Sequence, residues 1–239
     1  MGIPVISPRP CGLTLILLSK AKLFPVNGAM VGRSLPETRM RLSRRALVIA
    51  VAAVPLVAAK RNREVRVRMV TEKGTIVLAL YPDRAPITVA NFLAYADRGL
   101  LDGATFYRTV SPKNDNNPAT ISVIQGGLGD GGTRLPPIAL ETTQRTGLRH
   151  TDGVISMARD TPGSATSEFF ICLGDDASLD YGGLRNKDGQ GFAAFGKVVD
   201  GMDVVRAIHD APTLSKADDP YMKGQIIEKP VRILKLSRK

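Results

Sequence analysis

The chain has 239 residues, of which 44% are hydrophobic and 23% charged, a composition typical of one globular domain with tails; it excludes a disordered or collagen-like chain. The formal net charge of +11 is of the size found in nucleic-acid-binding proteins. The charge is uneven, because residues 1–59 carry eight Lys and Arg against one acid and residues 64–239 carry 22 against 21. Since the globular part is nearly neutral and lacks Trp, we expect no nucleic-acid partner.

The N-terminal part has the layout of a secretory signal. A basic run, residues 39–45, precedes an apolar run, residues 46–59, that ends in small residues. As a helix this run would reach only about 21 Å, short of a bilayer core of about 30 Å. We therefore divide the chain into a leader, residues 1–59, and a domain, residues 60–239. We expect export to the periplasm, with the leader contacting the membrane on the way; the pair Arg44–Arg45 resembles a twin-arginine signal.

Two alternatives stay open for the leader. An uncleaved leader would anchor the chain to a membrane. Residues 1–38 are also longer than a signal needs before its basic run, so that Met30 and Met40 are alternative starts and an acid-poor organellar transit segment is an alternative interpretation.

Cysteine use indicates a fold that depends on its core. Only Cys11 and Cys172 are present, so a domain without its leader has a single cysteine and no internal disulfide. We expect Cys172, inside the apolar run 169–173, to be buried and unreactive.

The domain opens with signals for a hairpin and a helix. Apolar residues alternate on both sides of a turn at residues 72–74, which predicts a hairpin over residues 65–80. Pro86 then begins a predicted helix that runs to about Asp97, with Thr88 or Asp83 as the polar residue near its start.

Short strands dominate the rest of the chain. They are predicted at residues 105–110, 121–125, 153–158, 168–173, 192–198 and 226–236, with a second helix at 201–209. Many strands, two helices and Gly-rich connections predict a mainly β fold, a closed barrel or a sandwich rather than a parallel sheet.

Several kinds of chemistry are poorly supported. Residues 127–132 match G-x-G-x-x-G, but the following residues 133–137 cannot open a helix cleanly, so we expect a loop and no phosphate site. The acidic residues lack calcium-loop spacing and the two His give no zinc site, so we expect no metal. No G-x-S-x-G elbow is present to support a serine hydrolase.

Five sequence blocks occur in a fixed order. They are Thr105–Arg108 (TFYR), Ile124–Gly127 (IQGG), Gly153–Arg159 (GVISMAR), Ser164–Ile171 (SATSEFFI) and Ala194–Met202 (AFGKVVDGM). Together they resemble the cyclophilin family of peptidyl-prolyl cis-trans isomerases, or rotamases, in its bacterial form, from about Val65 to Leu236. The resemblance implies a closed eight-stranded antiparallel β-barrel with two capping α-helices. It also implies a monomeric enzyme of protein folding that needs no cofactor and acts on proline-containing polypeptide clients.

The resemblance assigns roles to individual residues. Arg108 would donate to the prolyl nitrogen as that atom becomes pyramidal, and the Gln125 carboxamide would hold the substrate backbone, so that both count as catalytic. The proline ring would lie in an apolar cup. The residues given to this cup are Phe106, Val123, Met157, Phe170, Leu179 and Phe192. The backbone at Ala158 and Arg159 would pair with the extended substrate as an added strand. Residues 111–120 would form an inserted loop beside the site.

The chain departs from the family pattern around this site. The family commonly has an aromatic residue and a methionine shortly before the Gln, where this chain has Val123 and Ser122. Ser178 replaces an aromatic residue, Phe192 a His or Tyr, and Glu168 a Gln. Smaller side chains bury less area and so reduce affinity, at about 25 cal/mol per Å². The function predicted is acceleration of X-Pro rotation in folding proteins; the alternative is a weak or inactive cyclophilin-like module that binds Pro-containing segments.

Overall fold

The computed structural model of the chain describes residues 63–239. The predicted leader, residues 1–59, lies outside this range, as does the division of the chain at residue 60. None of the helices described is both long enough and apolar enough to cross a membrane.

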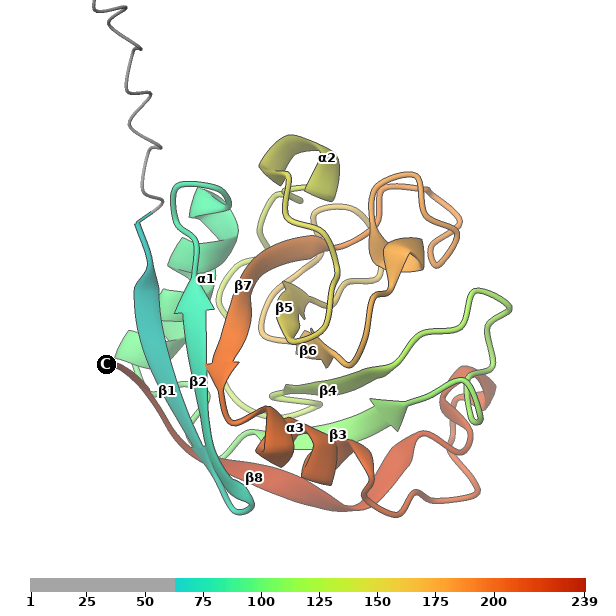
Figure 1. Cartoon of the computed structure of the whole chain (residues 1–239). Coiled ribbons are helices and arrows are strands. Elements are labelled where there is room, and N and C mark those ends of the chain that lie inside the picture. Colours follow the sequence, from blue (N-terminus) through green and yellow to red (C-terminus); the bar gives the residue numbers. More distant parts are fainter. Residues whose placement is uncertain (1–62) are drawn as a thin grey trace, which may run out of the picture. The chain divides into compact units, whose positions relative to one another are not determined.

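Eight strands form a closed barrel (Figure 1). They are β1 (Val65–Thr71), β2 (Gly74–Leu80), β3 (Thr105–Val110), β4 (Val123–Gly127), β5 (Val154–Met157), β6 (Phe169–Cys172), β7 (Ala193–Asp200) and β8 (Ile226–Arg238). Their order around the barrel is β1-β2-β7-β5-β6-β4-β3-β8, and pairing of β8 with β1 closes the ring. Every pair of neighbours is antiparallel, which confirms the predicted closed antiparallel barrel.

Two helices pack on the barrel. Helix α1 (Pro86–Asp97) contacts β7 and β8, and helix α3 (Met202–His209) contacts β2, β3 and β4. The chain enters α3 through Gly201, whose φ of 87° favours glycine and where a Cβ would lie only 2.3 Å from the Thr75 carbonyl oxygen. Both predicted helices are therefore present, and apolar side chains of both belong to the main core.

The start of α1 corrects one detail of the prediction. Ala85 occupies the N-cap position, and neither Thr88 nor Asp83 caps the helix with its own side chain. Instead, the buried Glu141 accepts hydrogen bonds from the Thr88 N–H and from its hydroxyl, each of 2.8 Å. A carboxylate at a helix N-terminus satisfies free N–H groups and is favoured by the helix dipole. This acceptor lies 53 residues away, so no local pattern could reveal it.

The two faces of the sheet bury different clusters. Side chains alternate between faces along a strand, so Phe169 and Ile171 of β6 point into the barrel whereas Phe170 and Cys172 point outward. The outward cluster lies under loops and consists of Val110, Ile121, Val123, Phe170, Cys172, Leu179 and Phe192. Cys172 is fully buried, as predicted, and burial raises the pKa of its thiol well above the usual value.

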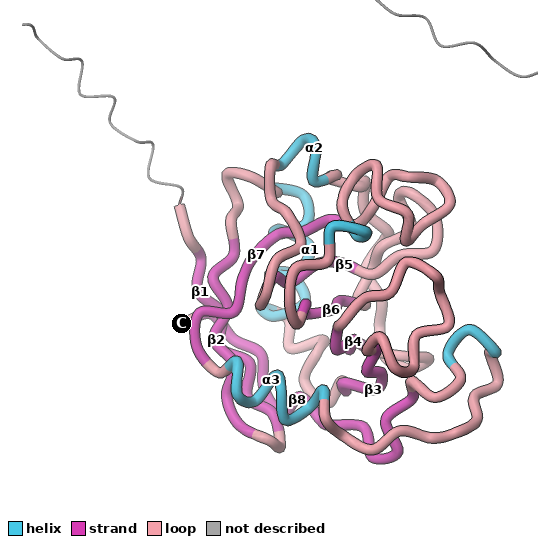
Figure 2. Tube along the Cα trace, turned by 45° about the vertical axis from the view of Figure 1, so that its right-hand side comes forward, coloured by secondary structure: helices cyan, strands magenta, loops and turns pink. Residues whose placement is uncertain are grey.

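Some shorter elements were not predicted. They are the single turn α2 (Thr143–Thr146) and the 3₁₀ turns η1 (Ala177–Leu179) and η2 (Pro220–Met222). Strand β4 also begins and ends two residues later than predicted. Residues 128–142 form no helix, so the glycine-rich match is a loop, as expected. Figure 2 shows that most of the chain beside β3, β4 and β6 consists of loops.

Candidate active site

Three predicted site residues lie in one row across the outside of the barrel. Arg108 of β3 is paired with Gln125 of β4, and Gln125 is paired with Phe170 of β6. Paired residues of neighbouring strands point to the same face, so the three side chains emerge together. The guanidinium Nη1 donates to Gln125 Oε1 over 3.0 Å. The sequence blocks are thus brought together as the resemblance implied.

A β-bulge separates Arg108 from Phe106. The register of β3 shifts between these residues, so that Phe106 pairs with Gly126 and Arg108 with Gln125, which leaves Tyr107 as the extra residue. Because Gly126 and Gln125 face opposite sides, Phe106 points into the barrel. Its side chain is fully buried in the main core. The assignment of Phe106 to the proline cup is therefore corrected.

Met157 is corrected for a related reason. It pairs with Phe169, an inward residue, and belongs to the main core with 1% of its surface exposed. Its neighbour Ser156 pairs with Phe170 and faces outward. Strand alternation thus assigns Met157 to the barrel interior, away from the cleft.

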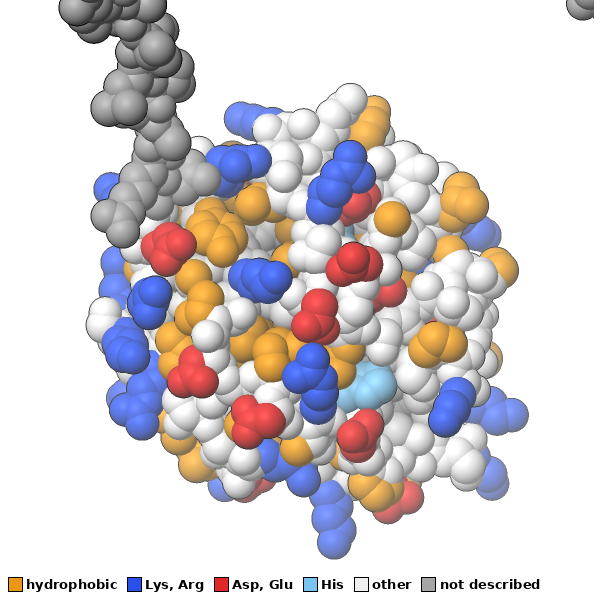
Figure 3. Space-filling model, viewed as in Figure 1, with side chains coloured by type: hydrophobic (Ala, Val, Ile, Leu, Met, Phe, Trp, Pro, Cys, Tyr) orange, Lys and Arg blue, Asp and Glu red, His pale blue; other side chains and the backbone are white. Residues whose placement is uncertain are grey.

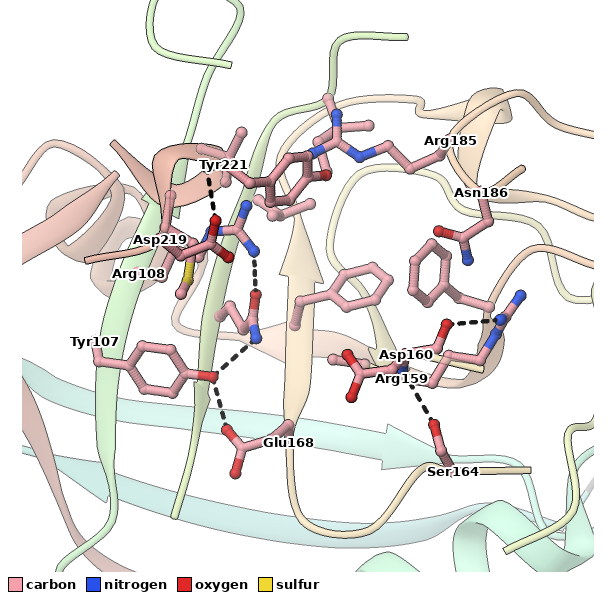
Figure 4. A pocket seen from close by; sticks show the side chains of 18 of the residues that line it. Tyr107, Arg108, Arg159, Asp160, Ser164, Glu168, Arg185, Asn186, Asp219 and Tyr221 are labelled. Atoms are coloured by element: carbon pink, nitrogen blue, oxygen red, sulfur yellow. Dashed lines mark hydrogen bonds between the residues drawn. The ribbon is translucent and has the colours of Figure 1, made fainter. Parts of the chain in front are cut away.

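The remaining predicted cup residues line an open cleft of about 1360 Å³ (Figure 4). Its apolar wall consists of Val123, Phe170, Leu179 and Phe192 from the prediction, together with Val110 and Ile121, which the sequence analysis did not single out. The rings of Phe170 and Phe192 meet edge to face, with centroids 5.3 Å apart. This wall lies beside Arg108 and is of the kind that accepts a small apolar ring.

A buried polar trio supports Phe170 from behind. His150 stacks on the Phe170 ring at 5.8 Å and bonds Asp180 on one side (2.8 Å) and the Ser156 hydroxyl on the other (2.9 Å). Burial opposes ionisation of Asp180, but its hydrogen bonds from His150 outweigh this and lower the pKa of the carboxyl. Ser156 has no exposed surface, so the trio fixes the aromatic wall and cannot act on a substrate.

Arg108 is held on two edges and one face. Gln225 Oε1 accepts from Nε (2.9 Å) and from Nη2 (2.5 Å), and Gln125 Oε1 accepts from Nη1. The ring of Tyr221 covers the guanidinium at 5.3 Å. Burial lowers the pKa of Arg108, but a guanidinium remains protonated in proteins. Three of its five N–H groups donate to these two carboxamides, and the guanidinium lines the cleft.

Ala158 and Arg159 also line the cleft, and Arg159 lies across it from Arg108 (Figure 4). The Ala158 N–H is bonded to the Glu168 carbonyl, so it is not free to pair with a substrate. The Arg159 side chain bonds Asp188 through two nitrogens, at 2.7 and 2.9 Å, and stacks on Phe192 at 5.4 Å. Hydrogen bonding to Arg159 lowers the pKa of Asp188 to about 2.

Comparison with known proteins identifies this arrangement. Residues 66–237 match the family model described as cyclophilin type peptidyl-prolyl cis-trans isomerase/CLD. The chain belongs to the cyclophilin family. It is 32% identical over 190 residues to a peptidyl-prolyl cis-trans isomerase of Acinetobacter baylyi, which covers 77% of this chain and 90% of that protein. It is 35% identical over 146 residues to peptidyl-prolyl cis-trans isomerase B of Escherichia coli, covering 60% and 84%.

The fold of this cyclophilin also matches solved structures. A cyclophilin type isomerase of Cryptosporidium parvum has a TM-score of 0.57 at 21% identity and covers 74% of this chain and 98% of that chain. A second structure of that protein was determined in the presence of the dipeptide Ala-Pro, with a TM-score of 0.56 at 22% identity and coverage of 73% and 98%.

The cyclophilin barrel carries a roof that sequence analysis largely missed. Three loops contact one another beside Arg108: residues 111–122, 180–191 and 210–225, here called the three-loop roof. Asp115 of the first loop forms an ion pair with Arg185 of the second, and Arg185 lies over the ring of Tyr221 of the third at 5.7 Å. Only the first loop was predicted to lie beside the site, because the other residues belong to no recognisable block.

Proposed function

We propose that this domain accelerates cis-trans rotation about X-Pro bonds of folding polypeptides, with Arg108 as the catalytic donor. One observation carries the proposal: a buried guanidinium, fixed by two carboxamides, lines the cleft beside an apolar wall. The family and its relatives named peptidyl-prolyl cis-trans isomerase support the same activity.

The reaction demands little more than this arrangement. Rotation about a peptide bond faces a barrier of about 18–20 kcal/mol because amide resonance gives the bond double-bond character. No bond is broken, and no cofactor is required. A donor aimed at the prolyl nitrogen stabilises its lone pair as the atom becomes pyramidal, which weakens resonance in the transition state. The wall of Phe170, Leu179 and Phe192 would hold the ring while the preceding carbonyl turns.

The substrate class follows from this wall and from the relatives. A cyclophilin structure determined with Ala-Pro supports proline-containing peptides as ligands. The cleft of this chain mixes acidic and basic side chains along its rim, among them Asp130, Arg134, Asp160 and Lys187. We therefore propose uncharged backbone and proline, rather than a charged motif, as the main recognition element.

The decisive experiment is an isomerisation assay on a Pro-containing peptide, with the full chain and with residues 60–239. Arg108→Ala should lower kcat/KM by at least about tenfold, equivalent to about 1.4 kcal/mol of barrier. The matched control is Arg68→Ala, which removes an exposed arginine from β1. Equal rates for the wild type and Arg108→Ala would remove Arg108 from the mechanism. No rate above background, with peptide binding retained, would favour the non-catalytic binding module.

We also propose that the domain acts as a monomer after export, directed by the leader. The support for export is the sequence of residues 39–59 alone, a basic run followed by an apolar run; the monomer is an expectation from the family resemblance. Cell fractionation with N-terminal sequencing tests this. A periplasmic chain that starts near residue 60 supports cleavage, a membrane-bound full chain supports an anchor, and a cytoplasmic full chain contradicts export. Sedimentation of the purified domain tests the monomer.

A further inference from the structure

We infer that Tyr107 and Glu168 are positioning residues that fix the Gln125 carboxamide and, through it, the Arg108 guanidinium. This inference rests on the proposed function and extends it to two residues that no comparison assigns. The four side chains form one continuous chain of hydrogen bonds across β3, β4 and the residue before β6 (Figure 4).

The direction of each hydrogen bond in this chain is determined. An ionised carboxylate only accepts, so the single Tyr107 hydroxyl proton must go to Glu168 Oε2, 2.8 Å away. The hydroxyl oxygen can then only accept, and it does so from Gln125 Nε2 at 2.8 Å. Gln125 Oε1 is consequently turned toward Arg108. With the opposite amide orientation, an NH₂ group would face the guanidinium N–H groups and no bond could form.

Glu168 itself is rigidly held. Its Oε1 accepts from the Ser167 hydroxyl (2.9 Å) and from the Gly129 N–H (3.2 Å), while Oε2 faces Tyr107. Its carboxylate lies so close to Gly127 that a Cβ there would be 2.5 Å from Oε2, and Gly127 has a φ of 150°. The second glycine after Gln125 is therefore needed to admit the carboxylate.

The bulge in β3 places the Tyr107 side chain within this network of hydrogen bonds. As the extra residue of the bulge, Tyr107 lies next to Arg108 in sequence yet reaches Gln125 from a different direction. Burial and the charge of Glu168 raise the pKa of the Tyr107 hydroxyl, which keeps its proton in place. The result is a guanidinium that lines the cleft and whose plane is set from one edge by Gln225 and from the other by Gln125.

The test uses the full chain and the peptide isomerisation assay. Tyr107→Phe should lower kcat by about tenfold with little change in KM, and Glu168→Gln by about threefold, because an amide no longer dictates the direction of the hydroxyl proton. The double variant should be no worse than Tyr107→Phe. The matched control is Tyr95→Phe, which deletes a buried hydroxyl that accepts from the Leu135 N–H outside the network and should leave kcat unchanged.

A second background separates positioning from a purely structural role. In Arg108→Ala the guanidinium is gone, so Tyr107→Phe should change the rate by less than about twofold. An equal loss in both backgrounds would overturn the inference. Failure of the proposed function would look different, as a wild type without isomerase activity. The side-chain NMR signals then decide: Tyr107→Phe should shift the Arg108 Nη1–H resonances and speed their exchange with solvent, and unchanged resonances refute the positioning role.

Discussion

Arg108 is held by two neutral carboxamides, with no carboxylate among its hydrogen-bond partners in the described residues. Gln225 and Gln125 orient the guanidinium without neutralising it, so its full charge is available at the cleft. Gln225 is itself fixed, being fully buried and donating to the Asn114 carbonyl over 2.8 Å. In a partly desolvated site an unpaired charge polarises a nearby lone pair more strongly than an ion pair does.

Replacing Gln225 with Glu should therefore impair catalysis. The new carboxylate would occupy the position of the present acceptor and form an ion pair with Arg108. We expect kcat/KM to fall by about tenfold, because the charge would no longer face the substrate alone. The thermal midpoint is measured beside the rate and should fall, because the carboxylate can no longer donate to the Asn114 carbonyl, although the hydrogen bonds to Arg108 remain and gain charge.

The control for this variant is Gln144→Glu, which adds the same charge on the exposed side of α2. It should leave both the rate and the midpoint unchanged. Unaltered kcat/KM in Gln225→Glu would mean that the uncompensated charge of Arg108 plays no part in the reaction.

At this scale the sequence predicted the centre of the site better than its walls. Arg108 and Gln125 could be found because each belongs to a distinctive block on a strand. Phe106 and Met157 were misassigned because a single extra residue in β3, and the alternation of β5, decide which way a side chain points. Gln225 was missed because it follows a loop without a motif, and its role depends on a contact 117 residues away.

Among the elements, the three-loop roof owes its order to one buried ion pair. The side chains of Asp115 and Arg185 are 0% and 3% exposed and lie 2.6 Å apart. Asp115 also accepts from the N–H groups of Asn117 and Ile121, and Arg185 donates to the Ala119 carbonyl. Both oxygens of Asp115 and the Nη1 group of Arg185 are thus hydrogen-bonded, which helps a buried ion pair to persist.

Removing one partner of the Asp115–Arg185 ion pair should destabilise the folded domain. Asp115→Ala leaves the Arg185 charge buried and unpaired, and we expect a loss of about 3 kcal/mol in the free energy of unfolding, measured by urea denaturation. The double variant Asp115→Ala/Arg185→Met removes both charges and should recover a large part of this loss. If the double variant were as unstable as Asp115→Ala, the lost stability would come from the loop backbone and not from the buried, unpaired charge of Arg185.

The elements differ in how far local sequence determines them. The β1–β2 hairpin and α1 follow from alternation, a turn and Pro86, and their predicted bounds agree closely with the structure. The limits of β4 and the roof loops depend on long-range contacts, such as Glu141 at the start of α1 and Asp115 with Arg185. Local patterns therefore predicted the strands and helices, but not what joins them.

For the molecule as a whole, the near-neutral count of 22 basic against 21 acidic residues from position 64 agrees with the surface. Figure 3 shows acidic and basic side chains interspersed over the centre of the face it presents, with apolar side chains between them. The centre of this face therefore has no extended patch of one charge sign. The excess charge of the chain belongs to residues 1–63.

The stability of the whole domain should carry a pH dependence from Asp176. This carboxyl is half-buried and accepts one long hydrogen bond, 3.3 Å from the Ser122 N–H, and burial raises its pKa to about 6. In the unfolded chain its pKa returns to the ordinary value of about 3.9. Between these two values the folded state binds more protons than the unfolded state, so the contribution of Asp176 to stability is complete below about pH 4 and is lost as the pH rises through 6.

Asp176→Asn cannot ionise and isolates this contribution. The free energy of unfolding of the wild type, relative to the variant, should fall by about 1 kcal/mol between pH 4 and pH 7, a value reduced for solvent screening of a partly exposed group. Asp188, whose pKa is lowered to about 2, acts in the opposite direction but at lower pH, and it is present in both proteins. If the free energy of unfolding of the wild type relative to Asp176→Asn stays constant from pH 4 to 7, or grows with pH, Asp176 ionises in the folded domain as freely as in the unfolded chain.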